Sequence, residues 1–149
     1  MVSWREGVPQ ETQDDFDMLF DRSLDCAVEL LGKSRALYPF AFTLSNEGEV
    51  AMHGSLPSES ATADEAEELL VAGLTGERDR FRAVAVAYTA SVTGDDGAPA
   101  DAVVVKLGHR DGVALNIYAW YTVKWRHRVA LGRMATMSGT LAIWPPSGR

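Results

Sequence analysis

Three long segments in the second half of the chain constrain its fold most. Residues 81–92, 102–107 and 113–123 alternate apolar side chains with small or polar ones, and they are rich in β-branched and aromatic residues. This pattern is typical of β-strands. The connections Gly94-Asp95-Asp96-Gly97 and Arg110-Asp111-Gly112 are turn sequences. Because a parallel pair needs a crossover of about a dozen residues or more, the three segments are predicted to form an antiparallel meander.

The first half of the chain supplies two amphipathic helices. Between residues 13 and 31, apolar side chains recur at the helical period, with Thr12 as the expected N-cap and Gly32 as the expected stop. The segment Thr62-Ala63-Asp64-Glu65 matches a capping box and predicts the start of the second helix. Acidic residues fill the arc of the first helix opposite its apolar side chains, and we expect this arc to be solvated. These acids are Asp14, Asp17, Asp21, Asp25 and Glu29.

Further strands complete the predicted sheet. Residues 40–44 and 49–53 read as a hairpin, and residues 128–134 and 140–144 can add two more strands around a turn at Ser138-Gly139. The sequence therefore predicts an α+β fold. Its antiparallel sheet has five to seven strands and carries both amphipathic helices on one face.

One globular domain is predicted over residues 1–149, with flexible ends at 1–11 and 145–149. In residues 83–92, small side chains face one way and large ones the other, so a helix, a second subunit or a ligand can approach the small face closely. The predicted core contains apolar side chains from both helices and from the strands. These are Phe16, Phe20, Leu24, Phe40, Phe42, Leu70 and Val104.

Charge is distributed unevenly along the chain. Residues 1–80 hold 17 acids and 6 Lys/Arg, whereas residues 81–149 hold 4 acids and 8 Lys/Arg, which gives a net charge of −7. The acidic balance opposes encounter with phosphate polymers, so we expect no nucleic-acid partner. No stretch approaches the roughly 20 apolar residues of a membrane span, and the acidic N-terminal start lacks the pattern of a secretion signal. We therefore expect a cytoplasmic protein without a membrane partner, in which Cys26 is a half-buried small hydrophobe.

No catalytic or cofactor motif stands out. The tripeptide Gly32-Lys33-Ser34 resembles the end of a phosphate-binding loop, but Ala27 occupies the place of the first glycine and the tripeptide ends a helix. His53, His109 and His127 lie in separate segments without metal-ligand spacing. We assign no catalytic residue and expect no metal or nucleotide cofactor. The sequence favours a non-enzymatic protein.

Two groups of residues are candidates for a site. The basic aromatic segment consists of Lys124, Trp125, Arg126, Arg128 and Arg133. Cations interleaved with an aromatic ring can form an interface, protect an edge strand or bind an anion. A possible pocket on the sheet consists of Tyr88, Asn116 and Tyr118. We expect a binding protein that interacts with itself as a homodimer or with another protein. The alternative is a small-molecule carrier, a sensor or a small enzyme with a pocket between sheet and helices.

Several short motifs together resemble a family of small uncharacterised bacterial proteins. They are Phe40-Ala41-Phe42, Arg82-Ala83-Val84-Ala85-Val86, Asp101-Ala102-Val103-Val104-Val105 and Gly108-His109-Arg110-Asp111-Gly112. The resemblance spans about residues 16–144. It implies no activity, cofactor or catalytic residue.

Overall fold

The fold is known from a computed structural model, which describes residues 4–33, 39–54, 63–93, 97–139, 141 and 143–144. In these ranges the chain forms two α-helices, six strands and two short 3-10 helices. The helices are α1 (Gln10–Lys33), α2 (Ala63–Gly76), η1 (Arg78–Arg80) and η2 (Trp125–His127). The strands are β1 (Phe40–Ser45), β2 (Val50–Gly54), β3 (Phe81–Thr93), β4 (Pro99–His109), β5 (Ala114–Lys124) and β6 (Arg128–Ser138).

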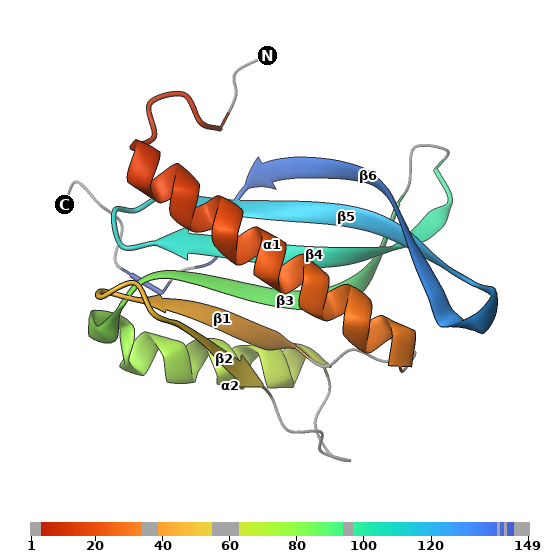
Figure 1. The fold of residues 1–149 in the computed structure, drawn as a ribbon, viewed down its shortest axis with the longest axis horizontal. Helices are drawn as coiled ribbons and strands as arrows, with labels where there is room; N and C mark the ends of the chain where they lie inside the picture. The colour runs from red at the N-terminus through yellow and green to blue at the C-terminus, as the bar shows by residue number, and fades with distance from the viewer. Residues whose placement is uncertain are drawn as a thin grey trace.

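The strands form a single sheet in the order β2-β1-β3-β4-β5-β6, and every neighbouring pair is antiparallel (Figure 1). This confirms the predicted α+β class, the antiparallel sheet and the meander from β3 to β5. Within the described ranges, neither α1 nor α2 combines the length and the hydropathy that crossing a membrane requires.

Helix α1 crosses one face of the sheet diagonally (Figure 1). Phe16, Leu19 and Leu31 of α1 are buried in one cluster with alanines of β3 and with aliphatic side chains of β4. Ala83, Ala85 and Ala87 have no side chain beyond Cβ, so the helix can approach the sheet closely. The small face of β3 is therefore the seat of α1. We call this side of the sheet the α1 face.

Helix α2 lies against the opposite side, the α2 face. Leu74 of α2 packs in a second buried cluster with Ala41, Val84, Val86 and Ile143. Successive residues of a strand point to opposite faces, so Val84 and Val86 face away from the alanines of β3 that contact α1. The expectation that both helices share one face is wrong. The reason is that β3 is apolar on both faces, so each face needs its own cover to keep water out.

Details at the ends of the elements also differ from the predictions. Thr12 is a buried residue inside α1 and not its N-cap, because the helix begins at Gln10. Gly32 belongs to the helix, which ends at Lys33. The flexible end predicted at 1–11 stays a prediction; of these residues the structure describes 4–11, and the ring of Trp4 lies 6.0 Å from that of Phe16. Thr62 and residues 145–149 lie outside the described residues.

The predicted last strand at 140–144 is also wrong where the structure describes it. Leu141, Ile143 and Trp144 are not in a strand. Ile143 is buried in the α2-face cluster instead, and the indole N–H of Trp144 donates to the Arg78 carbonyl at 3.2 Å. Four of the seven predicted core residues are buried: Phe16, Leu24, Phe40 and Val104. Phe20, Phe42 and Leu70 are half-buried against the two clusters.

Candidate functional site

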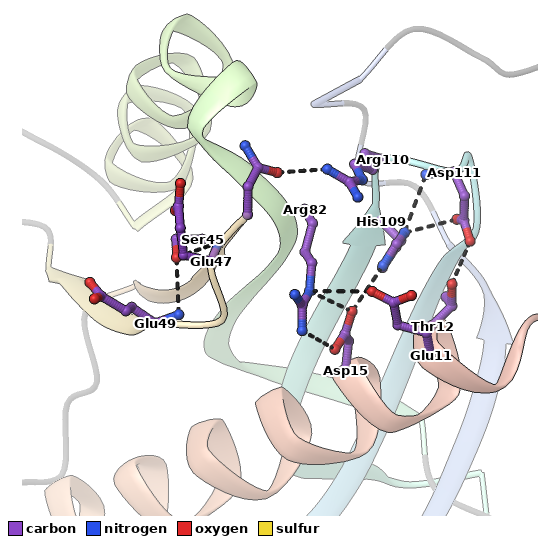
Figure 2. A network of polar contacts seen from close by, with 11 residues as sticks. Glu11, Thr12, Asp15, Ser45, Glu47, Glu49, Arg82, His109, Arg110 and Asp111 are labelled. Atoms are coloured by element: carbon purple, nitrogen blue, oxygen red, sulfur yellow. Dashed lines mark hydrogen bonds and ion pairs between the residues drawn. The ribbon is translucent and has the colours of Figure 1, made fainter.

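A buried group of polar side chains joins the first half of α1 to the sheet. We call it the polar cluster: Thr12, Asp15, Arg82, His109 and Asp111 (Figure 2). Arg82 donates from Nε and from Nη2 to the two carboxylate oxygens of Asp15, at 3.1 Å each. This hydrogen bonding raises the pKa of Arg82. His109 Nε2 lies 3.1 Å from the same carboxylate, and both Asp15 and His109 are only about 5% exposed.

The second ring nitrogen of His109 faces Asp111 in the turn between β4 and β5. The backbone N–H of Asp111 donates to His109 Nδ1 at 3.2 Å, so a neutral ring with its proton on Nε2 can donate to Asp15. The Asp111 carboxylate accepts from the hydroxyl of Thr12 and from the backbone N–H of Val113. The polar cluster thereby ties α1 to β3, to β4 and to the following turn.

The side chains of the polar cluster are hydrogen-bonded to one another, and this limits the chemistry that they can perform. His109 contacts two carboxylates and a backbone N–H, and the hydroxyl of Thr12 donates to Asp111. An activated nucleophile needs a base within hydrogen-bond reach. In the part of the chain that the structure describes, His109 has no hydroxyl or thiol partner. We interpret the polar cluster as a structural anchor.

A cavity of about 640 Å³ lies at the other end of α1. We call it the α1-end cavity. It lies between the last turn of α1, strands β4 and β5, and η2. Its lining residues are Leu31, Asp101, Tyr121, Val123, Lys124, Trp125 and Arg126. The basic aromatic segment predicted from the sequence therefore meets a cavity between helix and sheet.

Trp125 and Arg126 form a preorganised pair at this cavity. The side chain of Trp125 is 79% exposed, and the guanidinium carbon of Arg126 lies 4.4 Å from the centroid of its ring system. Arg126 has φ 61° and ψ 33°, and it is the one non-glycine residue with positive φ among those described. This conformation costs an L-residue roughly 1 kcal/mol or more. In this conformation the guanidinium lies over the indole.

The cations of the α1-end cavity differ from five other cations of the described chain in their ion pairing. Arg5, Lys33, Arg80, Arg82 and Lys106 each form an ion pair. Across the same ranges neither Lys124 nor Arg126 has an acid within 4.0 Å. Burial raises the pKa of the Tyr121 hydroxyl, and the nearby charge of Asp101 raises it further. The hydrogen bond with Thr89 lowers this pKa but does not cancel the rise.

The other two members of the basic aromatic segment, Arg128 and Arg133, do not line the cavity. Arg128 is exposed at the start of β6 and does not line the cavity. Arg133 lies over the ring of Trp120, 5.0 Å from its centroid. Trp120 pairs with Ala102 and faces away from α1. The structure thus brings Lys124, Trp125 and Arg126 to one cavity. Arg128 is the cross-strand partner of Lys124 but does not line that cavity, and Arg133 lies against Trp120.

The three residues of the predicted sheet pocket lie on the α2 face. Tyr88 and Tyr118 both pair with Val104 of β4, and Asn116 pairs with Lys106. The ammonium of Lys106 lies 5.2 Å from the centroid of the Tyr88 ring and 2.9 Å from the Glu67 carboxylate of α2. Burial raises the pKa of Tyr88, whereas the hydrogen bond from Lys106 opposes the rise. None of the predicted three lines the α1-end cavity.

Among the residues that the structure describes, the remaining titratable side chains do not gather into a further centre. Nε2 of His53 lies 3.0 Å from the hydroxyl of Thr43, and neither residue belongs to the polar cluster. Burial raises the pKa of the half-buried Cys26 thiol. In the described ranges no three His, Cys, Asp or Glu side chains form a group suited to a metal ion. The side chain of His127 lies outside the described part.

Comparison of the chain with protein-family models, with curated proteins and with solved structures found no match in any of the three. The resemblance across residues 16–144 therefore stays a prediction.

Proposed function

We propose that this protein is a protein-binding protein that forms a homodimer through strand β6. The observation that carries the proposal is that β6 is a long edge strand with an unpaired outer side in the described part of the chain. β6 has 11 residues and stands at the end of the sheet, and no described strand pairs with its outer side (Figure 1). An uncovered edge presents backbone N–H and C=O groups that pair readily with a strand of another chain.

The side chains of β6 suit an interface better than a solvated edge. Leu131, Met134 and Met137 are 42%, 45% and 57% exposed, and the strand contains no proline and no acid. Protected edges are usually short or carry charges that discourage pairing. The charges of β6 are Arg128 and Arg133, spread over 11 residues, whereas the opposite edge, β2, is protected by its short length of five residues.

A groove beside β6 supports a second copy as the occupant. A cavity of about 240 Å³ lies between α1 and the sheet, and Met134 forms part of its wall. Most of its lining is apolar: Trp4, Phe16, Phe20, Leu107, Ile117 and Met134, with Arg5, Asp17 and Thr136. Antiparallel pairing of two β6 strands about a two-fold axis brings apolar side chains of each copy next to the groove of the other. The core on the α1 face then continues across the seam.

Sedimentation of Met134→Arg tests the proposal. The wild-type protein is expected to form a concentration-dependent dimer, and the added charge in the seam should weaken it by at least about tenfold. Met52→Arg is the matched control, because Met52 is 50% exposed on the other edge strand. Circular dichroism checks that both variants fold.

Two outcomes would overturn the proposal. A wild-type protein that stays monomeric at high micromolar concentration excludes the homodimer. A dimer that Met134→Arg leaves intact, but that Trp125→Ala or Arg128→Glu weakens, places the interface at the basic aromatic segment instead of the β6 edge.

A further inference from the structure

The size and position of the α1-end cavity suit a small ligand. Its volume of about 640 Å³ lies within the range of roughly 300–1,000 Å³ that is typical of small-molecule sites. None of the lining residues belongs to β6. A ligand here therefore does not depend on the proposed dimer.

The polar part of the wall favours an acidic group. Lys124 and Arg126 line the cavity without an ion-pair partner among the described residues, although the chain carries 21 acids against 14 Lys/Arg. Asp101 supplies one carboxylate, and the end of α1 adds a partial negative charge of about half a unit. The two full cations outweigh these charges. Asp101 remains available to accept a hydrogen bond from a donor group of the ligand.

The apolar part of the wall favours a planar ring. Trp125 exposes most of its indole, and Leu31, Val123 and the ring of Tyr121 line the same space. Arg126 is already held against Trp125, 4.4 Å from its ring centroid. A ring that packs on these side chains would carry its acidic substituent next to two cations at little further cost in ordering.

A nucleic-acid strand does not fit the surroundings of the cavity. Leu31 belongs to α1, whose exposed arc carries Asp21, Asp25 and Glu29 toward that end. A polymer of phosphates would meet these like charges as it left the cavity. A ligand with a single acidic group would not.

We propose that the α1-end cavity binds a small organic anion, a carboxylate or a phosphate monoester, that bears a planar ring. Lys124 and Arg126 hold the acidic group and Trp125 contacts the ring. This assignment makes the protein a ligand-binding protein in addition to any self-association.

Calorimetric titration of the whole 149-residue chain tests the site with three related probes. They are 1-naphthoate, 1-naphthyl phosphate and the neutral 1-naphthamide. At least one anion is expected to bind, and naphthamide should bind at least about tenfold more weakly because it gains no charge-assisted hydrogen bond. The ranking of the two anions distinguishes a carboxylate ligand from a phosphate ligand.

Variants assign the binding to the named side chains. Lys124→Gln combined with Arg126→Gln should weaken the anions by about tenfold or more. Arg133→Gln is the matched control, since this exposed cation lies over Trp120, outside the cavity, and should leave affinity unchanged. Trp125→Ala should weaken the naphthyl anions by about fivefold or more through loss of ring packing. Thermal unfolding verifies the fold of each variant.

The results that contradict the assignment are specific. Failure of both anions to bind at millimolar concentration overturns it, as does equal binding of naphthamide or an unchanged affinity in the double variant. The Met134→Arg variant separates this assignment from the proposed dimer. It should bind the anions as the wild type does, whatever its state of association.

Discussion

The charged side chains near the two ends of α1 differ in whether they are paired. Near the start of the helix, Asp15 is buried and shared by Arg82 and His109. Near its end, Lys124 and Arg126 lie beside a cavity without an ion-pair partner in the described chain. In one region the charged groups are buried and paired with one another, and the other region is open and retains positive charge.

This difference separates stability from binding. Removing one member of a buried ion pair leaves an uncompensated charge and costs about 3–5 kcal/mol. Replacing an exposed side chain without partners usually changes stability by no more than about 0.5 kcal/mol. The polar cluster is therefore expected to hold α1 on the sheet. The α1-end cavity can exchange a solvent contact for a ligand contact without loss of the fold.

The substitution Asp15→Asn is expected to have the largest effect. It leaves Arg82 and His109 without their common anion, and Arg82 is only 21% exposed. The free energy of unfolding, measured by urea titration, should fall by about 3 kcal/mol. Asp17→Asn is the matched control, because Asp17 pairs with Arg5 at the surface and should cost less than about 1 kcal/mol. Equal losses for the two variants would remove the contrast between the buried and the open region.

The fold was largely predictable because periodicity is a local property of the sequence. The helical period of residues 13–31 and the alternation of residues 81–92 identified α1 and β3. The side of the sheet that each helix covers is a property of the whole chain. Val84 and Ala85 point to opposite faces, and both are fully buried. Two buried faces on one strand are the signal that could have placed α1 and α2 on opposite sides.

The candidate site was predictable where its residues are adjacent in sequence. Lys124, Trp125 and Arg126 follow one another, and the structure brings them to one cavity. The polar cluster was missed because Asp15 is 67 residues from Arg82 and 94 from His109. One local signal existed. Asp15 lies on the apolar side of α1, four residues before the fully buried Leu19, and a carboxylate in that position needs a buried partner.

Arg126→Gly should change the free energy of unfolding much less than Asp15→Asn does. Glycine relieves the cost of the left-handed conformation, about 1 kcal/mol, and loses the exposed contact with Trp125, worth about 0.5–1 kcal/mol. The free energy of unfolding should stay within about 0.5 kcal/mol of the wild type. Lys124→Gly is the control, because its extended backbone gains nothing from glycine and should lose about 0.5–1 kcal/mol. A larger loss for Arg126→Gly than for Lys124→Gly would show that Arg126 supports the fold.

The smallest expected effect concerns the hydroxyl of Tyr121, which tests whether Asp101 keeps its charge in the open region. Burial raises the pKa of Tyr121 above its ordinary value of 10.0, and the Asp101 carboxylate adds to the rise. Because the folded-state pKa is the higher one, the folded protein binds the proton more tightly than the unfolded chain does. The contribution of Tyr121 to stability is therefore complete below about pH 10 and is lost as the pH rises through the folded-state pKa. Asp101→Asn should lower the pKa of Tyr121, measured by the absorbance of tyrosinate, with Tyr121→Phe to assign the signal. An unchanged pKa in Asp101→Asn would mean that the Asp101 charge is neutralised as fully as the charge of Asp15, and the two ends of α1 would then differ less than their geometry indicates.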